Sequence, residues 1–167
     1  MAEQIDFLTW QALTGVLHEE AAALDEQRWD DWLSLFSDDC IYWVQAWNGE
    51  HELAEDPERD VSLVYMDDKA MIEDRLWRFT SGTAPAAIPL PRTSHLVGTV
   101  ALESFSGNEA TLRSHWQVSA YRFKELTETA GRSYYTLRLE QGQWRIARRR
   151  SVLINDQVQT TLDLYHL

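Results

Sequence analysis

Four long segments that follow Arg92 limit the folds open to this chain. All four are rich in β-branched and aromatic residues, as strands are, and they read TSHLVGTVALESF, ATLRSHWQVSAYRF, RSYYTLRLE and QWRIARRRSVLIN. The turn residues SGN separate the first pair and QGQ separates the last pair, which predicts antiparallel hairpins. The longer segment KELTETAG is expected to join the middle pair. The second half of the chain is therefore expected to form an antiparallel sheet.

Two amphipathic helices and a short strand are expected before this sheet. Between residues 5 and 24 the apolar residues recur at spacings of three and four, the period of one buried helix face. A second stripe, which includes Trp29, Trp32 and Phe36, keeps this spacing until the run SDD stops it, and the strand CIYWVQAW follows. Helices ahead of a run of antiparallel strands predict an α+β fold, with the helices packed on one face of a curved sheet.

The middle of the chain combines an acidic loop, a strand, a third helix and a proline-containing arm. Residues 48–60 have no apolar period and are expected to form a solvated loop before the strand VSLVYM. Asp67 can cap a helix through DDKAMIEDRLWRF, and Gly82 can end it. The segment TAPAAIPLP holds three prolines, so it is expected to be an irregular arm over the surface.

Apolar side chains occupy both faces of the first two long strands. In the strand after Arg92, Leu96 and Val100 share one face, whereas Val97 and Ala101 share the other. The helices can cover one of these faces, and an enclosed pocket or a partner protein could cover the other.

Length and composition favour one domain that spans residues 1–167. A chain of 167 residues with 44% hydrophobic residues can build one core, and no apolar stretch approaches the roughly 18 residues that cross a bilayer. Without a visible signal peptide or membrane anchor, the sequence predicts a cytoplasmic protein that contacts no membrane. The net charge of −12 argues against a nucleic-acid partner, because phosphate contacts require a basic face.

The charge is unevenly distributed along the chain. Residues 1–80 carry 20 Asp and Glu against 5 Lys and Arg, whereas residues 81–167 carry 7 against 10. This asymmetry would suit head-to-tail contact between chains, although solvated helix carboxylates explain it as well.

The donor set for a metal or an iron–sulfur cluster is missing from the sequence. Cys40 is the single cysteine, which excludes an internal disulfide and any cluster that needs several thiolates from one chain. The histidines are isolated from one another: His18, His51, His95, His115 and His166. The phosphate-binding loop, the dinucleotide glycine pattern and the serine elbow are absent as well.

One acid/base constellation remains open. His95 and His115 fall on adjacent expected strands, and Asp31 and Tyr42 lie on or just after the second helix. A carboxylate that orients a histidine in a half-apolar cone could serve a small dehydratase or isomerase. A strand histidine is more often a hydrogen-bonded structural residue, and Asp31 lies opposite the apolar stripe, where solvation is the default.

Arg75 and Arg78 raise a separate question, because they lie among large apolar residues near the end of the third helix. They are three residues apart, so they share one helix face. They could extend along the helix and pair with Asp68 or Asp74, or they could donate to carboxylates or carbonyls of a neighbouring chain.

Three segments carry a resemblance to a known family: SLVYMDDKAMIEDRLWRFTSG, PLPRTSHLVGTV and WRIARRRSVLIN. Together they resemble the small (β) subunit of the Rieske-type aromatic-ring-hydroxylating dioxygenases, and most of all its benzoate and anthranilate branch. The resemblance covers nearly the whole chain, and the joint occurrence of EDR, PRTSH and a strand ending in LIN is fairly specific. It implies a cone-shaped α+β fold similar to nuclear transport factor 2 and scytalone dehydratase.

The resemblance also implies partners and cofactors. Small subunits of this family assemble with a large α subunit, and with one another, in an α3β3 hexamer. The α subunit holds a Rieske 2Fe–2S cluster, a mononuclear iron and the substrate, and it receives electrons that come ultimately from NAD(P)H through a reductase or ferredoxin. This chain would then be a largely structural subunit without catalytic, cofactor-binding or metal-binding residues. Arg75, Arg78, Arg92 and His95 would organise the fold and the subunit contacts.

Two other function classes stay open at this point. A self-sufficient dehydratase, isomerase or small-ligand binder on the same cone fold would use Asp31, Tyr42, His95 and His115. A non-enzymatic adaptor would need no pocket at all. Benzoate or anthranilate is favoured for the dioxygenase, but the sequence does not define the aromatic substrate.

Overall fold

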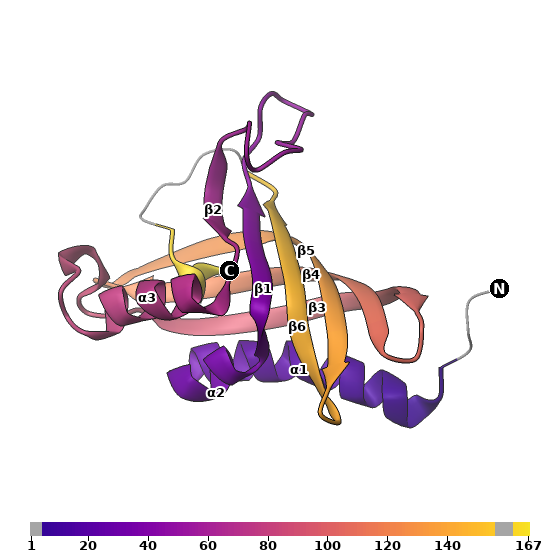
Figure 1. Ribbon diagram of the computed structural model, residues 1–167. Coiled ribbons are helices and arrows are strands. Elements are labelled where there is room, and N and C mark those ends of the chain that lie inside the picture. The colour runs from indigo at the N-terminus through magenta and orange to yellow at the C-terminus, as the bar shows by residue number, and fades with distance from the viewer. Residues whose placement is uncertain (1–4, 156–161) are drawn as a thin grey trace.

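One curved sheet of six strands organises the chain (Figure 1). The computed structural model describes residues 5–155 and 162–167. Along the sheet the strands follow the order β2 (Ser62–Met66), β1 (Phe36–Gln45), β6 (Gln143–Leu153), β5 (Glu125–Glu140), β4 (Glu109–Arg122) and β3 (Arg92–Phe105). All neighbouring strands are antiparallel except β1 and β6, which run parallel. The α+β class and the antiparallel hairpins of the second half are confirmed.

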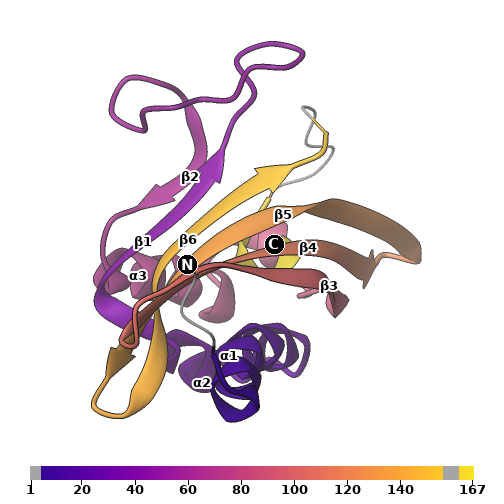
Figure 2. The same ribbon diagram turned by 90° about the vertical axis from the view of Figure 1, so that its right-hand side faces the viewer.

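In the described residues three α-helices accompany this sheet: α1 (Phe7–Asp25), α2 (Trp29–Ser34) and α3 (Lys69–Thr80). Figure 2 shows α1 and α2 lying under one face of the sheet, which arches over them. The helix α1 contacts β3 and β6, and α3 contacts β1 and β2. The helices and the sheet together form a cone whose interior is the core.

Side-chain caps fix where α1 and α3 begin. The Asp6 carboxylate accepts a hydrogen bond from the Thr9 backbone N–H at 2.7 Å, and this contact starts α1. The helix α3 starts in the same way at Asp68, which accepts from the Met71 N–H at 2.8 Å. The expected cap, Asp67, lies one residue too early.

The strand β1 begins earlier than the sequence indicates. The helical stripe predicted a helix through Phe36, but α2 ends at Ser34 and β1 starts at Phe36. The reason is long-range pairing, since Leu35 O accepts from Ile146 N–H at 2.8 Å and Phe36 pairs with Ile146 of β6. The run SDD that was expected to stop the helix therefore lies in β1, where Asp38 and Asp39 are exposed.

The hairpin between β4 and β5 is tighter than expected. It turns on two residues, Phe123 and Lys124, with φ angles of 54° and 64°. Two successive positive φ angles are typical of a type I′ turn, whose twist matches that of the strands it joins. Most of KELTETAG consequently belongs to β5, which starts at Glu125.

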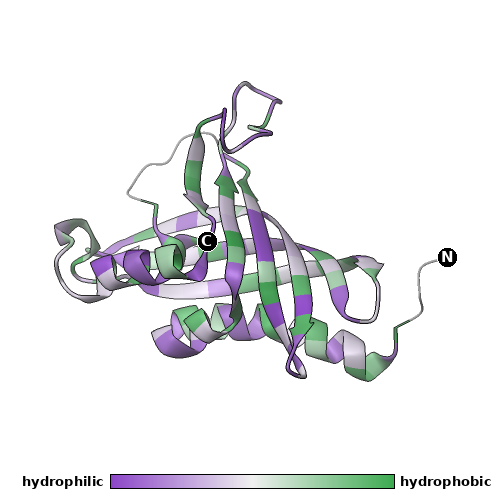
Figure 3. Cartoon of the chain, viewed as in Figure 1, coloured by the Kyte–Doolittle hydropathy of each residue, from purple (hydrophilic) through white to green (hydrophobic). Residues whose placement is uncertain are grey.

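The core lies between α1 and the inner face of the sheet. Leu13, Leu17 and Leu24 of α1 are at most 1% exposed, and burying each of them contributes roughly 1.5–3 kcal/mol. The strand β4 alternates regularly and turns Leu112, Ser114, Trp116, Val118 and Ala120 inward. Figure 3 shows the corresponding alternation of apolar and polar residues along the strands. One glycine is required, because a Cβ at Gly131 would lie 2.2 Å from the carbonyl oxygen of Val152 and 2.8 Å from the Trp116 ring.

Two irregular segments close the cone near α3. After α3 the proline-containing arm includes the short 3-10 helix Pro85–Ala87, and Arg122 Nη1 holds the arm by donating to Ala86 O at 2.5 Å. The C-terminal 3-10 helix Leu164–His166 buries Leu164 and Tyr165, and the Tyr165 ring meets Phe79 of α3 edge-on at 5.1 Å.

The acidic loop after β1 projects from the opposite end of β1 from α2 (Figure 1). It is not wholly solvated, because Ala54 is buried and its carbonyl accepts from Gln45 Nε2 at 2.5 Å. Across the described residues, no helix is both long enough and apolar enough to cross a membrane.

Candidate functional site

A histidine–aspartate pair joins the end of α1 to the start of β3. His95 Nδ1 lies 2.5 Å from Asp25 Oδ1, and the His95 side chain is only 6% exposed. Asp25 also accepts from the His95 N–H and from Thr93 Oγ1, both at 2.9 Å. Burial acts to raise the pKa of Asp25, but the hydrogen bonds from His95 and Thr93 outweigh it and leave the pKa below its ordinary value. Asp25 is therefore a carboxylate, and we place a proton of His95 on Nδ1.

A buried ion pair lies farther inside the cone. Glu20 of α1 and Arg149 of β6 are 3.2 Å apart, Oε1 to Nη1, and their side chains are only 4% and 3% exposed. The hydroxyl of Tyr135 donates to Glu20 Oε2 at 2.8 Å, and Arg149 Nη1 donates to the Tyr42 hydroxyl at 2.5 Å. The guanidinium also lies 5.1 Å from the Tyr42 ring centre and 5.6 Å from that of Tyr135.

The surroundings of this ion pair set the protonation of its partners. Burial raises the pKa of Tyr42 to about 12 and raises that of Tyr135 well above its usual value, so both hydroxyls stay neutral. Burial acts to lower the pKa of Arg149, but the charge of Glu20 outweighs it and holds the pKa above its ordinary value. The cluster therefore contains one permanent cation that one carboxylate neutralises.

The four acid/base candidates do not form one cluster. Tyr42 and His95 face the interior of the cone, but His115 lies exposed between two inward-facing residues of β4. Asp31 is exposed on α2 and binds Arg28 there, at 2.7 Å between Oδ2 and Nη1. The carboxylate that orients His95 is Asp25.

Three polar residues inside the cone, Glu20, Arg149 and Asp25, were not identified from the sequence. The positions of the first two, although not that of the third, could have indicated burial. Glu20 stands on the apolar stripe of α1, three residues after Leu17 and four before Leu24. Arg149 has the same strand parity as the inward-facing Ser151 and Leu153 of β6. A charged residue at a buried position predicts a buried partner. No comparable pattern marks Asp25, which simply ends α1.

The four interface candidates fall into two groups. Arg75 and His95 bind within their own chain, since Arg75 Nε lies 2.9 Å from Asp163 Oδ1 and its Nη2 lies 3.1 Å from Leu162 O. Arg78 is exposed in the last turn of α3, and Arg92 is exposed with its guanidinium 4.9 Å from the Tyr121 ring centre.

An exposed apolar patch surrounds Arg92. The strand register places Arg92, Tyr121 and Leu126 side by side across β3, β4 and β5. Tyr121 is 39% exposed and Leu126 is 63% exposed, while Phe123 at the tip of the hairpin is 68% exposed. We call these four residues the hairpin patch. A gathering of exposed aromatic and aliphatic side chains around an arginine is typical of protein contact surfaces.

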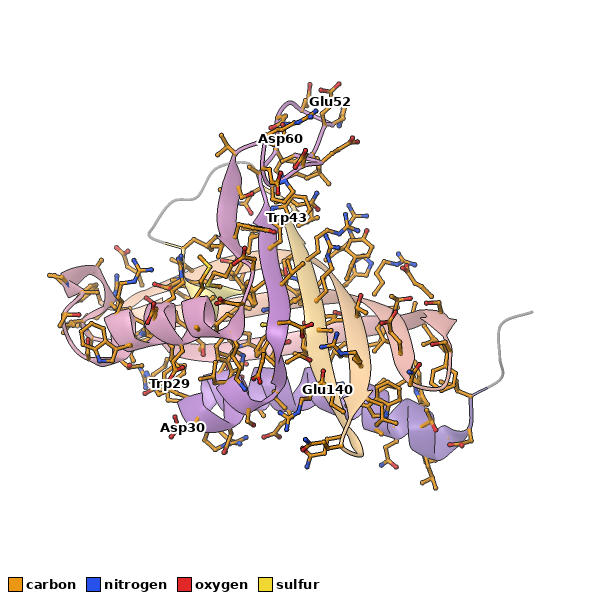
Figure 4. The ribbon with its side chains drawn as sticks, viewed as in Figure 1. Trp29, Asp30, Trp43, Glu52, Asp60 and Glu140 are labelled. Carbon is orange, nitrogen blue, oxygen red and sulfur yellow. The ribbon has the colours of Figure 1, made fainter. Side chains whose placement is uncertain are left out.

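Four of the acidic residues lie at different places in the fold. Glu52 and Asp60 lie in the loop beyond β1, whereas Asp30 lies on α2 at the opposite end of the view (Figure 4). Glu140, at the end of β5, is bound by Arg138 Nε at 2.7 Å and by Ser37 Oγ at 2.9 Å. Within residues 5–155 and 162–167, no three His, Cys, Asp or Glu side chains are placed to hold a metal ion.

Known proteins resemble this chain over nearly its whole length. The family described as "Ring hydroxylating beta subunit" matches residues 19–160. The benzoate 1,2-dioxygenase subunit beta of Acinetobacter baylyi is 30% identical over 163 residues, which are 98% of this chain and 96% of that protein. The crystal structure of the beta subunit of the benzoate 1,2-dioxygenase from Burkholderia mallei has a TM-score of 0.79 at 29% identity and covers 99% of both chains.

A more distant structure confirms the fold class alone. An NTF2-like protein with a cystatin-like fold from Novosphingobium aromaticivorans has a TM-score of 0.62 at 16% identity, over 90% of this chain and 84% of that one. The cone fold is thus shared beyond the dioxygenases. The match of the family over most of the chain, together with the benzoate dioxygenase relative, shows that this chain belongs to the ring-hydroxylating beta-subunit family.

Proposed function

We propose that this chain is the small, structural subunit of an aromatic-ring-hydroxylating dioxygenase and contributes no catalytic residue to the reaction. One observation carries the proposal: the chain matches the benzoate dioxygenase subunit from end to end, both in sequence and in fold. The proposed substrate is an aromatic acid such as benzoate or anthranilate. The proposed assembly is an α3β3 hexamer with a large subunit that holds a Rieske 2Fe–2S cluster and a mononuclear iron, and that receives electrons from NAD(P)H through a reductase or ferredoxin.

The residues of this chain do not fit either iron centre. A Rieske cluster takes two cysteines and two histidines, and the chain has one cysteine. Cys40 is buried, and burial raises the pKa of its thiol to about 11, which disfavours the thiolate that iron requires. A mononuclear centre takes two histidines and a carboxylate, and no such group of three comes together in the described residues; Asp25 binds His95, and His115 lies on the outer face of β4. These observations support a partner subunit as the place of both centres.

The four interface candidates differ in exposure, and this difference supports two separate roles, subunit contact and organisation of the fold. We propose that Arg78 and the hairpin patch with Arg92 contact other subunits, because these side chains are exposed beside apolar groups. We propose that Arg75 and His95 organise the fold behind those contacts, because each binds a carboxylate of its own chain.

Co-expression with a large Rieske-containing subunit tests the proposal. We expect native mass spectrometry to show a 1:1 complex, with iron in the complex and none in the purified small chain. We expect His95→Gln to leave the turnover of an aromatic acid per assembled complex within about twofold of the wild type, because the residue is not catalytic.

Three outcomes would count against the proposal. They are stoichiometric iron in the small chain alone, a small chain that ignores the large subunit, and an assembled His95→Gln complex with more than tenfold lower turnover. The last outcome would return the acid/base alternative to consideration. His115→Gln is the matched control, because this histidine is exposed on the other face of the sheet.

A further inference from the structure

A small cavity lies between α1 and the inner face of the sheet. Its volume is about 20 Å³, and its wall includes Leu17 and Glu20 of α1 together with His95, Trp116 and Arg149 of the sheet. A cavity needs roughly 10–15 Å³ to hold one water molecule, and it also needs two to four polar partners for that molecule. The volume alone is therefore sufficient for one water and too small for an aromatic acid.

Buried polar atoms that make no hydrogen bond gather on the residues that line this cavity. They are Glu20 Oε1, His95 Nε2, Trp116 Nε1 and Arg149 Nε, of which Glu20 Oε1 has only its ion-pair contact with Arg149 Nη1 at 3.2 Å. In the described part of the chain, the one other buried side-chain atom in this state is Trp32 Nε1, on a residue that does not line the cavity. Buried polar atoms nearly always have hydrogen-bond partners, so such a concentration points to a molecule that binds there.

The four atoms call for a ligand that both donates and accepts. Trp116 Nε1 and Arg149 Nε can only donate. Glu20 Oε1 can only accept, and His95 Nε2 accepts because Asp25 holds the proton of the ring on Nδ1. A water molecule offers two protons and two lone pairs, which matches this set. An anion would meet the Glu20 carboxylate, and a cation would meet the Arg149 guanidinium.

We infer that the cone contains an internal water-binding site, in which one water molecule binds to His95 Nε2 and to at least one of the other three atoms. The ligand class is a neutral hydroxylic molecule, and water is the member that fits. This site goes beyond the proposed structural role and does not depend on it.

A crystal structure of the full-length chain at high resolution tests the inference. We expect a single peak of density in the cavity, within about 3.2 Å of His95 Nε2 and of a second atom of the set. In solution, nitrogen-15 spectra of the histidine side chains should show the proton of His95 on Nδ1. They should also show contact between the ring of His95 and a long-lived water.

Two variants separate the site from general packing. Trp116→Phe removes one donor and His95→Phe removes the acceptor, so the density should shift in the first and disappear in the second. His115→Phe is the matched control, because its side chain lies on the outer face of β4, and the density should stay in place. A dry cavity in the wild type, density too large for one water, or a His95 ring protonated on Nε2 alone would each overturn the inference.

Discussion

Replacing Glu20 with Gln should destabilise the chain far more than its small change in shape implies. The side chain keeps its size and can still accept from the Tyr135 hydroxyl, which lies 2.8 Å away. What the variant loses is the negative charge that neutralises Arg149, whose side chain is 3% exposed. Breaking a buried ion pair on one side costs about 3–5 kcal/mol, because the remaining charge is left uncompensated.

The expected shift is large enough to measure by simple unfolding. For a chain of this size 1 kcal/mol corresponds to about 2–4 °C in Tm, so Glu20→Gln should lower Tm by roughly 10 °C. Urea unfolding followed by tryptophan fluorescence would give the free energy of unfolding directly. The double variant Glu20→Gln with Arg149→Met removes both charges and should recover part of the loss.

The control for this experiment is a second arginine whose ion pairs are exposed. Arg28 binds Glu19, Glu26 and Asp31, but its side chain is 34% exposed, so Arg28→Gln should lower the Tm far less than Glu20→Gln. A Glu20→Gln variant that loses no more than this control would refute the reasoning. A double variant that loses the sum of the two single losses would refute the coupling between the two charges.

Three further predictions follow from contacts elsewhere in the chain. Arg75→Met should cost about 1.5–3 kcal/mol of unfolding free energy, because it removes the charged hydrogen bonds to Asp163 and to the Leu162 carbonyl. Amide exchange in the C-terminal 3-10 helix should become faster, and unchanged exchange there would contradict the prediction. Burial lowers the pKa of His166 to about 4 from its ordinary 6.5, so the unfolded chain binds more protons between these values. Stability should then fall as pH drops from 6.5 towards 4, by at most about 3 kcal/mol, and His166→Gln should flatten the profile of Tm against pH. Gly131→Ala should prevent stable folding, because its new methyl group would lie 2.2 Å from the carbonyl oxygen of Val152. The control Gly15→Ala in α1 meets nothing within 4 Å and should stabilise the chain by about 0.5–1 kcal/mol. Circular dichroism during heating compares the two variants, and a stable Gly131→Ala variant would contradict the packing argument.

Local periodicity made most of the fold predictable. Alternation along β4 and the three- and four-residue spacing along α1 each depend on residues close together in sequence, so both elements could be placed before their partners were known. The exact start of a helix is harder to predict than the helix itself. Asp67 and Asp68 can both cap α3, and the choice between them depends on the geometry of the turn.

The errors arose where distant pairing or an atypical turn decided the structure. Phe36 continues a helical stripe, yet it pairs with Ile146 of β6 and becomes part of β1. The turn at Phe123 and Lys124 contains no glycine or asparagine, so nothing in its composition signals two positive φ angles.

The interior polar residues show how far site prediction could go. His95 was identified as chemically interesting, but its partner Asp25 lies 70 residues away and competes with many other carboxylates. The spacing of Glu20 along α1 and of Arg149 along β6 matches that of buried residues, so their burial could be predicted. Only the structure shows that the two side chains form an ion pair.

The parallel pairing of β1 with β6 constrains the order in which this protein can be completed. Residues 36–45 pair with the nearby strand β2 on one side, but their neighbour on the other side is residues 143–153, about a hundred positions later. During synthesis β1 and β2 must therefore wait as a detached hairpin while β3, β4 and β5 pair locally, since non-local contacts form late. The strand β6 then joins the two halves in one step, with β5 on one side and β1 on the other. Loss of the β6 segment would leave two separate sheets, β2-β1 and β5-β4-β3, each with open edges that favour aggregation.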